Sequence, residues 1–129
     1  MQSPDIHFQC VEKHISDNPL VIFHDFQKNS TSPSTAYIKG EVLFADGTIL
    51  ALFQHIRISE NGILITDYRY HYMNAEKNMI FRYDNAPHHD EIVSHPHHKH
   101  IANKIITSDM LHFKDVMDEI VSIIMNKML

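Results

Sequence analysis

The sequence has only one cysteine, Cys10, in 129 residues, so no internal disulfide can form. Structural disulfides belong to oxidising compartments, and their exclusion fits the reducing cytosol. No apolar run approaches the ~18 residues that a membrane-spanning helix needs. The first ten residues, MQSPDIHFQC, also lack the basic start and apolar core of a secretory signal. We therefore expect a cytoplasmic protein without a membrane partner, folded as one domain over residues 1–129.

Positive charge is also scarce, because the net charge is −5 with all histidines neutral. Surfaces that bind nucleic acid are normally basic, so this balance argues against an extended nucleic-acid interface. The twelve histidines weaken that exclusion. They titrate near neutral pH, and a bound phosphate favours their charged form. A local cationic site on an otherwise acidic surface suits a protein that binds phosphate at that site and a basic partner elsewhere.

The hydrophobic pattern predicts an α+β fold, with an antiparallel meander of five to six strands and a helix at each end of the chain. A short N-terminal helix begins at Ser3-Pro4-Asp5, with Ser3 as its N-cap, and Asn18-Pro19 ends it. The polar stretch Lys28–Ser34 is interpreted as a loop. The predicted strands are Leu20–Phe26, Thr35–Phe44, Ile49–Ile58, Ile63–Met73, Met79–Asp84 and the short edge segment Lys104–Thr107.

The final helix is amphipathic, and Ser108 or Asp109 can serve as its N-cap. Apolar residues then recur at helical spacing and predict one buried stripe, which comprises Phe113, Val116, Met117, Ile120, Val121 and Ile124. A sheet with one covered face needs such a helix.

Polar and aromatic side chains alternate in the hairpin formed by Ile63–Met73 and Met79–Asp84. Pairing Met73 with Asn78 sets a register, and the predicted pairs on the polar face are then His71 with Ile80, Arg69 with Arg82, and Asp67 with Asp84. The other face pairs Tyr68 with Tyr83, Tyr70 with Phe81, and Tyr72 with Met79. Opposed arginines repel, so an anion must lie between them. Aspartates would make a solvated salt-bridge face, and a phosphate would make a functional site.

Six histidines lie within thirteen residues directly after this hairpin, in the segment His88–His100. Three interpretations compete. A zinc or other transition-metal site would use His88, His89, His95, His97, His98 and His100. Adjacent histidines of an extended chain point to opposite sides, however, and no HExxH or CxxC motif is present. Acid/base catalysis on a phosphodiester needs only histidines and nearby cations, and is favoured. The third interpretation is a structural or partner-binding loop.

The motifs YRYHY (Tyr68–Tyr72), FRYDNAPHH (Phe81–His89) and PHHKH (Pro96–His100) resemble the signature of the TumE family of prokaryotic toxins. The resemblance extends from residue 36 onward and includes the Asp115–Ile120 helix, whereas the first 35 residues carry little of it. It implies a toxin that a cognate antitoxin neutralises. Small toxins of this kind often cleave mRNA, so the resemblance and the cationic hairpin together favour a metal-independent endoribonuclease without a cofactor.

Nine residues are the predicted catalytic set. His88, His98 and His100 are the expected acid and base groups, and Arg69, Arg82 and Lys99 are the expected phosphate ligands. His71, Asp84 and Asn85 would orient them. The expected partners are an antitoxin and RNA, and exposed edge strands are compatible with a homodimer. The alternative is a non-enzymatic module that binds a transition metal or a protein target.

Overall fold

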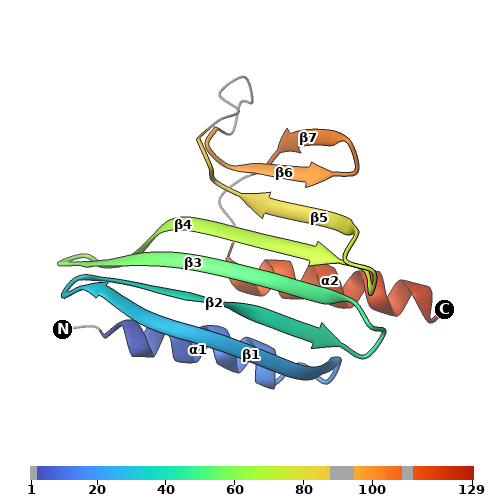
Figure 1. Cartoon of the computed structure of the whole chain (residues 1–129), viewed down its shortest axis with the longest axis horizontal. Coiled ribbons are helices and arrows are strands. Elements are labelled where there is room, and N and C mark those ends of the chain that lie inside the picture. The colour runs from blue at the N-terminus through green and yellow to red at the C-terminus, as the bar shows by residue number, and fades with distance from the viewer. Residues whose placement is uncertain (1–2, 88–94, 109–111) are drawn as a thin grey trace.

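A computed structural model describes residues 3–87, 95–108 and 112–129 of the chain (Figure 1). It has an α+β fold, and its seven-stranded antiparallel sheet runs in sequence order from β1 to β7. Helix α1 (Pro4–Ser16) precedes the sheet and helix α2 (Phe113–Lys127) follows it. The strands are β1 (Val21–Ser32), β2 (Thr35–Phe44), β3 (Ile49–Ser59), β4 (Gly62–Met73), β5 (Met79–Asp84), β6 (His98–Ile101) and β7 (Lys104–Thr107).

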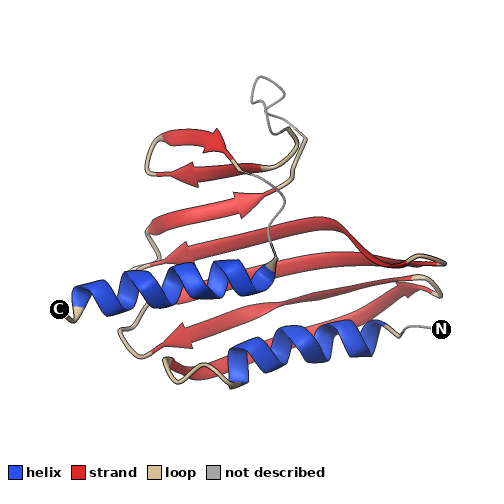
Figure 2. Ribbon diagram, turned by 180° about the vertical axis from the view of Figure 1, so that it is seen from behind, coloured by secondary structure: helices blue, strands red, loops and turns tan. Residues whose placement is uncertain are grey.

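Both helices lie on the same face of the sheet, and the described residues place no helix on the other face (Figure 2). The predicted start of α1 is confirmed, because the Ser3 hydroxyl accepts a hydrogen bond from the backbone N–H of Asp5 at 3.2 Å. The prediction for α2 is wrong at its start. His112 is the N-cap, and its backbone N–H donates to Asp115 at 3.4 Å. Ser108 lies outside the helix, and Asp109 lies outside the described residues.

The expected count of five to six strands is too low. The strand missing from the prediction is β6, which lies within the histidine-rich segment. Its sequence, HKHI, has only one apolar residue and so gives no strand signal. Its backbone pairs with β5 on one side and β7 on the other, so tertiary pairing rather than strand propensity places it in the sheet. The predicted loop Lys28–Ser34 is also wrong, because β1 continues to Ser32 and pairs there with β2. An edge strand can remain polar since it buries little of its surface.

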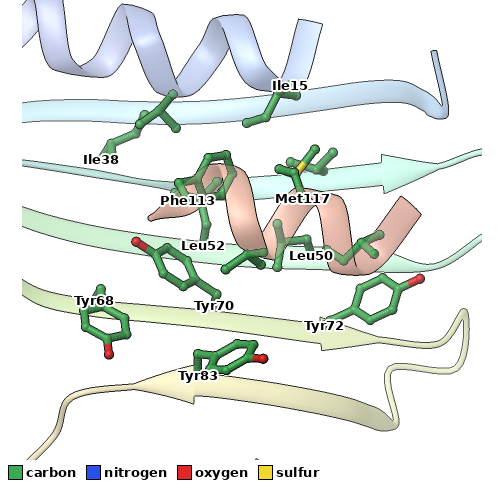
Figure 3. Close-up of a cluster of buried hydrophobic side chains, with 14 of the residues drawn as sticks. Ile15, Ile38, Leu50, Leu52, Tyr68, Tyr70, Tyr72, Tyr83, Phe113 and Met117 are labelled. Atoms are coloured by element: carbon green, nitrogen blue, oxygen red, sulfur yellow. The ribbon is translucent and has the colours of Figure 1, made fainter. Parts of the chain in front are cut away.

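The core lies between the helices and the covered face of the sheet (Figure 3). Alternate residues of β2 point into it as predicted, and these are Ala36, Ile38, Val42 and Phe44. Helix α2 contributes Phe113, Val116, Met117, Ile120 and Ile124, whereas Val121 is only partly buried. Four tyrosines of β4 and β5 complete the core: Tyr68, Tyr70, Tyr72 and Tyr83.

The β4–β5 hairpin keeps its predicted faces but not its predicted pairs. Arg69 faces Asp84, Tyr70 faces Tyr83, His71 faces Arg82, and Tyr72 faces Phe81. Relative to the predicted register the pairs from Arg69 to Tyr72 are shifted by two residues, one at the turn, where Met73 faces Met79, and one at a bulge between Tyr72 and Met73. The Asn74 side chain accepts backbone hydrogen bonds from Glu76 at 3.0 Å and from Asn78 at 2.9 Å, which fixes this turn. Because side chains alternate with period two, a shift of two moves partners without exchanging faces.

Candidate functional site

Two rows of polar side chains cross the helix-free face on β4, β5 and β6. A row here means the residues that face one another across neighbouring strands and therefore share a face. The first row is Arg69, Asp84 and His98, and the second is His71, Arg82 and His100. The structure thus brings together six of the nine predicted site residues, and the predicted pair of opposed arginines is replaced by an alternation of charge.

Asp84 is the buried centre of a group that we call the Asp84 cluster, formed by Arg82, Asp84, His98 and His100. Asp84 as a whole is only 5% exposed. Its Oδ2 accepts a hydrogen bond from Arg82 Nε at 3.1 Å and lies 3.4 Å from His100 Nε2. Its Oδ1 lies 2.7 Å from His98 Nε2 and accepts the backbone N–H of Ala86 at 3.1 Å. A buried carboxylate needs such partners, because desolvation of an unpaired charge is costly.

His98 is 1% exposed, and its two ring nitrogens both face oxygen atoms. Nδ1 donates to the carbonyl of Pro96 at 2.9 Å. A neutral ring with its proton on Nδ1 would then point the Nε2 lone pair at the Asp84 carboxylate. That arrangement is repulsive unless a proton or another cation lies on Nε2. The contact therefore requires a proton or another cation between Nε2 and Oδ1.

The guanidinium of Arg82 joins the carboxylate to His100. Its Nη2 donates to His100 Nε2 at 3.2 Å while its Nε donates to Asp84. Because Arg82 has only donors, the Nε2 atom of His100 accepts this hydrogen bond. The guanidinium side chain is 30% exposed, so it also reaches the surface of the open face. Arg82 therefore neutralises the buried Asp84 and can also be reached by a ligand on the open face.

His71 lies beside Arg82 in the second row and is partly exposed. Burial lowers the pKa of this histidine from its ordinary value of 6.5, and the charges of Arg82 and Arg69 lower it further. The ring is therefore neutral at pH 7 and can accept a proton. Its Nε2 atom is enclosed and has no hydrogen-bond partner among the residues that the structure describes.

An open hollow of about 240 Å³ adjoins the two rows. It is lined by Phe53, Asp67, Tyr68, Arg69, Arg82, Asp84, Asn85 and Ala86. A larger hollow of about 840 Å³ lies between the β1–β2 and β3–β4 turns, and none of the predicted site residues that the structure describes lines it. The smaller hollow is the relevant one, because it offers two arginines and two carboxylates to a ligand.

The structure does not bring Lys99 or Asn85 into the Asp84 cluster. Lys99 lies on the helix-covered face, where its Nζ is 2.7 Å from Glu119 and 4.7 Å from the centre of the Tyr83 ring. The Asn85 side chain accepts the backbone N–H of Tyr68 and donates to the carbonyl of Thr66, both at 3.0 Å. Asn85 therefore extends the β4–β5 pairing.

The six histidines of the metal interpretation are spread apart where the structure describes them. His95 is exposed, and His97 Nδ1 lies 2.8 Å from the Tyr68 hydroxyl on the covered face. His98 and His100 join Asp84, and these three residues offer ligand atoms within 4.8 Å of one another. His88 and His89 lie outside the described residues.

Sequence reasoning missed Phe53, which lines the hollow beside Arg69. A signal was present in β3. Its buried positions are Leu50, Leu52, Gln54 and Ile56, so the alternation places Phe53 on the polar face. A large aromatic residue on a face that is otherwise polar is a candidate for ligand contact.

The fold and the site define a small α+β protein with a histidine, arginine and carboxylate cluster on an open sheet face. The family model described as Toxin TumE matches residues 11–128 of the chain. The chain belongs to the TumE toxin family. The match also includes β1 and the second half of α1, where the sequence motifs carried little resemblance. No curated protein and no solved structure shows a significant match.

Family membership supports a toxin role and suggests an antitoxin as the partner. Within the described residues, neither helix is long and apolar enough to cross a membrane.

Proposed function

We propose that this TumE-family toxin is a metal-independent endoribonuclease. The observation that carries the proposal is the row His71, Arg82, His100 on the helix-free face. Neighbouring strands are about 4.8 Å apart, so the backbones of the two histidines lie roughly 10 Å apart with the arginine between them. A phosphate bound over Arg82 then has an imidazole on each side.

Cleavage of RNA by its own 2′-hydroxyl needs this kind of arrangement. The 2′-oxygen bonds to phosphorus and gives its proton to a base, while the bond from phosphorus to the 5′-oxygen breaks and that oxygen takes a proton from an acid. Base and acid act on opposite sides of the phosphorus. Cations between them stabilise the charge that develops on the phosphoryl oxygens. The product is a 2′,3′-cyclic phosphate.

The roles proposed for the residues differ from those expected from the sequence. His71 is the base, because it is neutral at pH 7. His100 is the acid. When the Arg82 guanidinium moves from His100 to the phosphate, the Nε2 atom of His100 is left facing the Asp84 carboxylate. The negative charge of Asp84 then stabilises the protonated form of His100. His98 is too deeply buried to touch RNA, so it positions Asp84. Arg69 is a second phosphate ligand, and His88 remains a predicted acid or base outside the described residues.

Metal binding is the second candidate, since Asp84, His98 and His100 offer a carboxylate and two imidazoles at ligand spacing. Arg82 argues against it. Its guanidinium already donates to Asp84 and to His100 Nε2, so a metal would have to displace one cation with another. The arginine thus supplies the positive charge that a metal would otherwise bring to this cluster.

An antitoxin strand or a second copy of the chain would add most readily to an outer edge of the sheet. At one edge, Ile105 and Ile106 of β7 are 37% and 40% exposed. At the other, Ile22 and Phe23 of β1 are 62% and 61% exposed. Coexpression with the neighbouring open reading frame tests the toxin assignment, because a cognate antitoxin should relieve growth arrest.

The test of the reaction is cleavage of end-labelled single-stranded RNA by the purified, untagged chain, with and without EDTA. Cleavage should survive the chelator and leave 2′,3′-cyclic phosphate ends. The variants His71→Asn and His100→Asn should each lose at least about a hundredfold in rate. The matched control is His24→Asn on exposed β1, which should cleave normally. Cleavage that stops in EDTA and returns with stoichiometric zinc would establish the metal alternative instead.

A further inference from the structure

Two aromatic side chains of β2 and β3 lie next to each other on the helix-free face, beside the site. Tyr37 of β2 and Phe53 of β3 have ring centres 6.2 Å apart and ring planes inclined by 30°. Both residues are partly exposed. The remaining aromatic residues of β2 to β5 point into the core, so this pair is not explained by core packing.

The aromatic pair is connected to the proposed phosphate site through Phe53. Phe53 faces Arg69 on one side and Lys39 on the other, which extends the first row of the site across β3 and β2. It borders the hollow beside the Asp84 cluster and a second hollow of about 570 Å³ over β1, β2 and β3. The Lys39 ammonium lies 5.9 Å from the centre of the Tyr37 ring. Cations therefore flank the aromatic pair on both sides.

We propose that Tyr37 and Phe53 form a stacking platform for a base of single-stranded RNA, next to the phosphate held by Arg69 and Arg82. This proposal rests on the ribonuclease function and names where the substrate binds. Bases of single strands have free faces that stack on aromatic rings, whereas a duplex hides those faces within its own stack. Lys39 contacts the next phosphate along the strand. The partner is thus an unpaired segment with at least one base beside the cleaved bond.

Acidic side chains limit the path of the strand over the sheet. Asp25 and Glu41 face one another in the second row, one row away from Lys39, and both are exposed. They would repel a phosphate. The strand therefore continues from Arg69 over Phe53 towards Lys39 and Tyr37, instead of crossing the part of the face that Glu41 occupies. This explains why a chain of net charge −5 can bind RNA locally.

The test measures binding by fluorescence polarisation, which separates it from cleavage. One probe is a short single-stranded RNA with 2′-O-methyl groups, which block cleavage, and the other has the same backbone without bases. Phe53→Ala should weaken binding to the first probe about five- to hundredfold and leave binding to the second unchanged. Phe53→Leu should show most of this loss, because it keeps apolar volume but no ring. Phe23→Ala is the matched control, an exposed phenylalanine at the edge of the same face, and should change binding less than twofold.

Each outcome decides the proposal. Equal losses on both probes, wild-type binding by Phe53→Leu, or no binding of the base-bearing probe would overturn it. If the Phe53 variants bind and cleave RNA normally but fail to bind the antitoxin, the aromatic pair is a contact surface for the antitoxin. That result would also overturn the proposal. Base-dependent binding that Phe53→Ala removes supports the platform even if no cleavage is found, and in that case only the ribonuclease function fails.

Discussion

Replacement of Asp84 by alanine should be the most damaging single change in the site. Asp84 as a whole is 5% exposed, and its carboxylate lies 3.1 Å from Arg82 Nε and 2.7 Å from His98 Nε2. Removal of one partner from a buried ion pair costs about 3–5 kcal/mol. Arg82 is partly exposed and can recover water, so the lower end applies, and we expect a loss of about 3 kcal/mol. For a domain of this size the midpoint of thermal unfolding should fall by about 10 °C.

Thermal and urea unfolding followed by circular dichroism measure this loss, with Asp67→Ala as the matched control. Asp67 lies on the same sheet face with a side chain that is 65% exposed, so its removal should cost less than about 0.5 kcal/mol. Asp84→Asn should lose roughly half as much as alanine, because the amide still accepts from Arg82 and can donate to a neutral His98. If Asp84→Ala is no less stable than Asp67→Ala, the buried cluster does not stabilise the fold and the assignment of Asp84 fails.

The remaining predictions concern pH, the covered face and one close approach of strands. Because a lowered pKa keeps His71 neutral, cleavage should fall with decreasing pH at a midpoint below 6.5, and Arg69→Gln should move that midpoint upward in a pH–rate profile. Tyr68→Phe removes a 2.8 Å hydrogen bond to His97 and should cost about 1 kcal/mol in urea unfolding; a neutral result would mean that this contact is not formed in solution. Gly40→Ala should cost at least about 1–3 kcal/mol in the same assay, since a Cβ there would overlap the backbone of β1, and an unchanged midpoint would contradict the strand pairing.

The fold was largely predictable where side chains alternate strongly. Strand β2 shows four buried apolar residues at period two, and its bounds were predicted without error. The polar cap at Ser3 marked the start of α1. Local chemistry decides these features, so a single sequence suffices. The faces of the β4–β5 hairpin were predicted for the same reason, because a tyrosine at every second position leaves only one face for arginine and histidine.

The pairs across that hairpin and the existence of β6 were not predictable in this way. A bulge at Tyr72 and a turn held by Asn74 add two residues to the register, and neither has a reliable signal in local sequence. Strand β6 has two histidines and a lysine among its four residues, and it exists because Asp84, Arg82 and Tyr83 pair with it. The site depends on both features, so its residue types could be predicted and its contacts could not.

The two-residue shift also changes what the site can do. The predicted register would place Arg69 against Arg82, and that pair needs a bound anion before it is stable. The observed register gives each arginine a different neighbour, Asp84 for Arg69 and His71 for Arg82. Arg82 is therefore held in place by its hydrogen bonds to Asp84 and His100 before any phosphate arrives. A cation that already lies at the site can stabilise the negative charge that develops on the phosphoryl oxygens, once Arg82 has exchanged its hydrogen bond to His100 for the phosphate. The proposed cleavage needs the whole row of histidine, arginine and histidine, whereas the capture of an anion would need only the arginines.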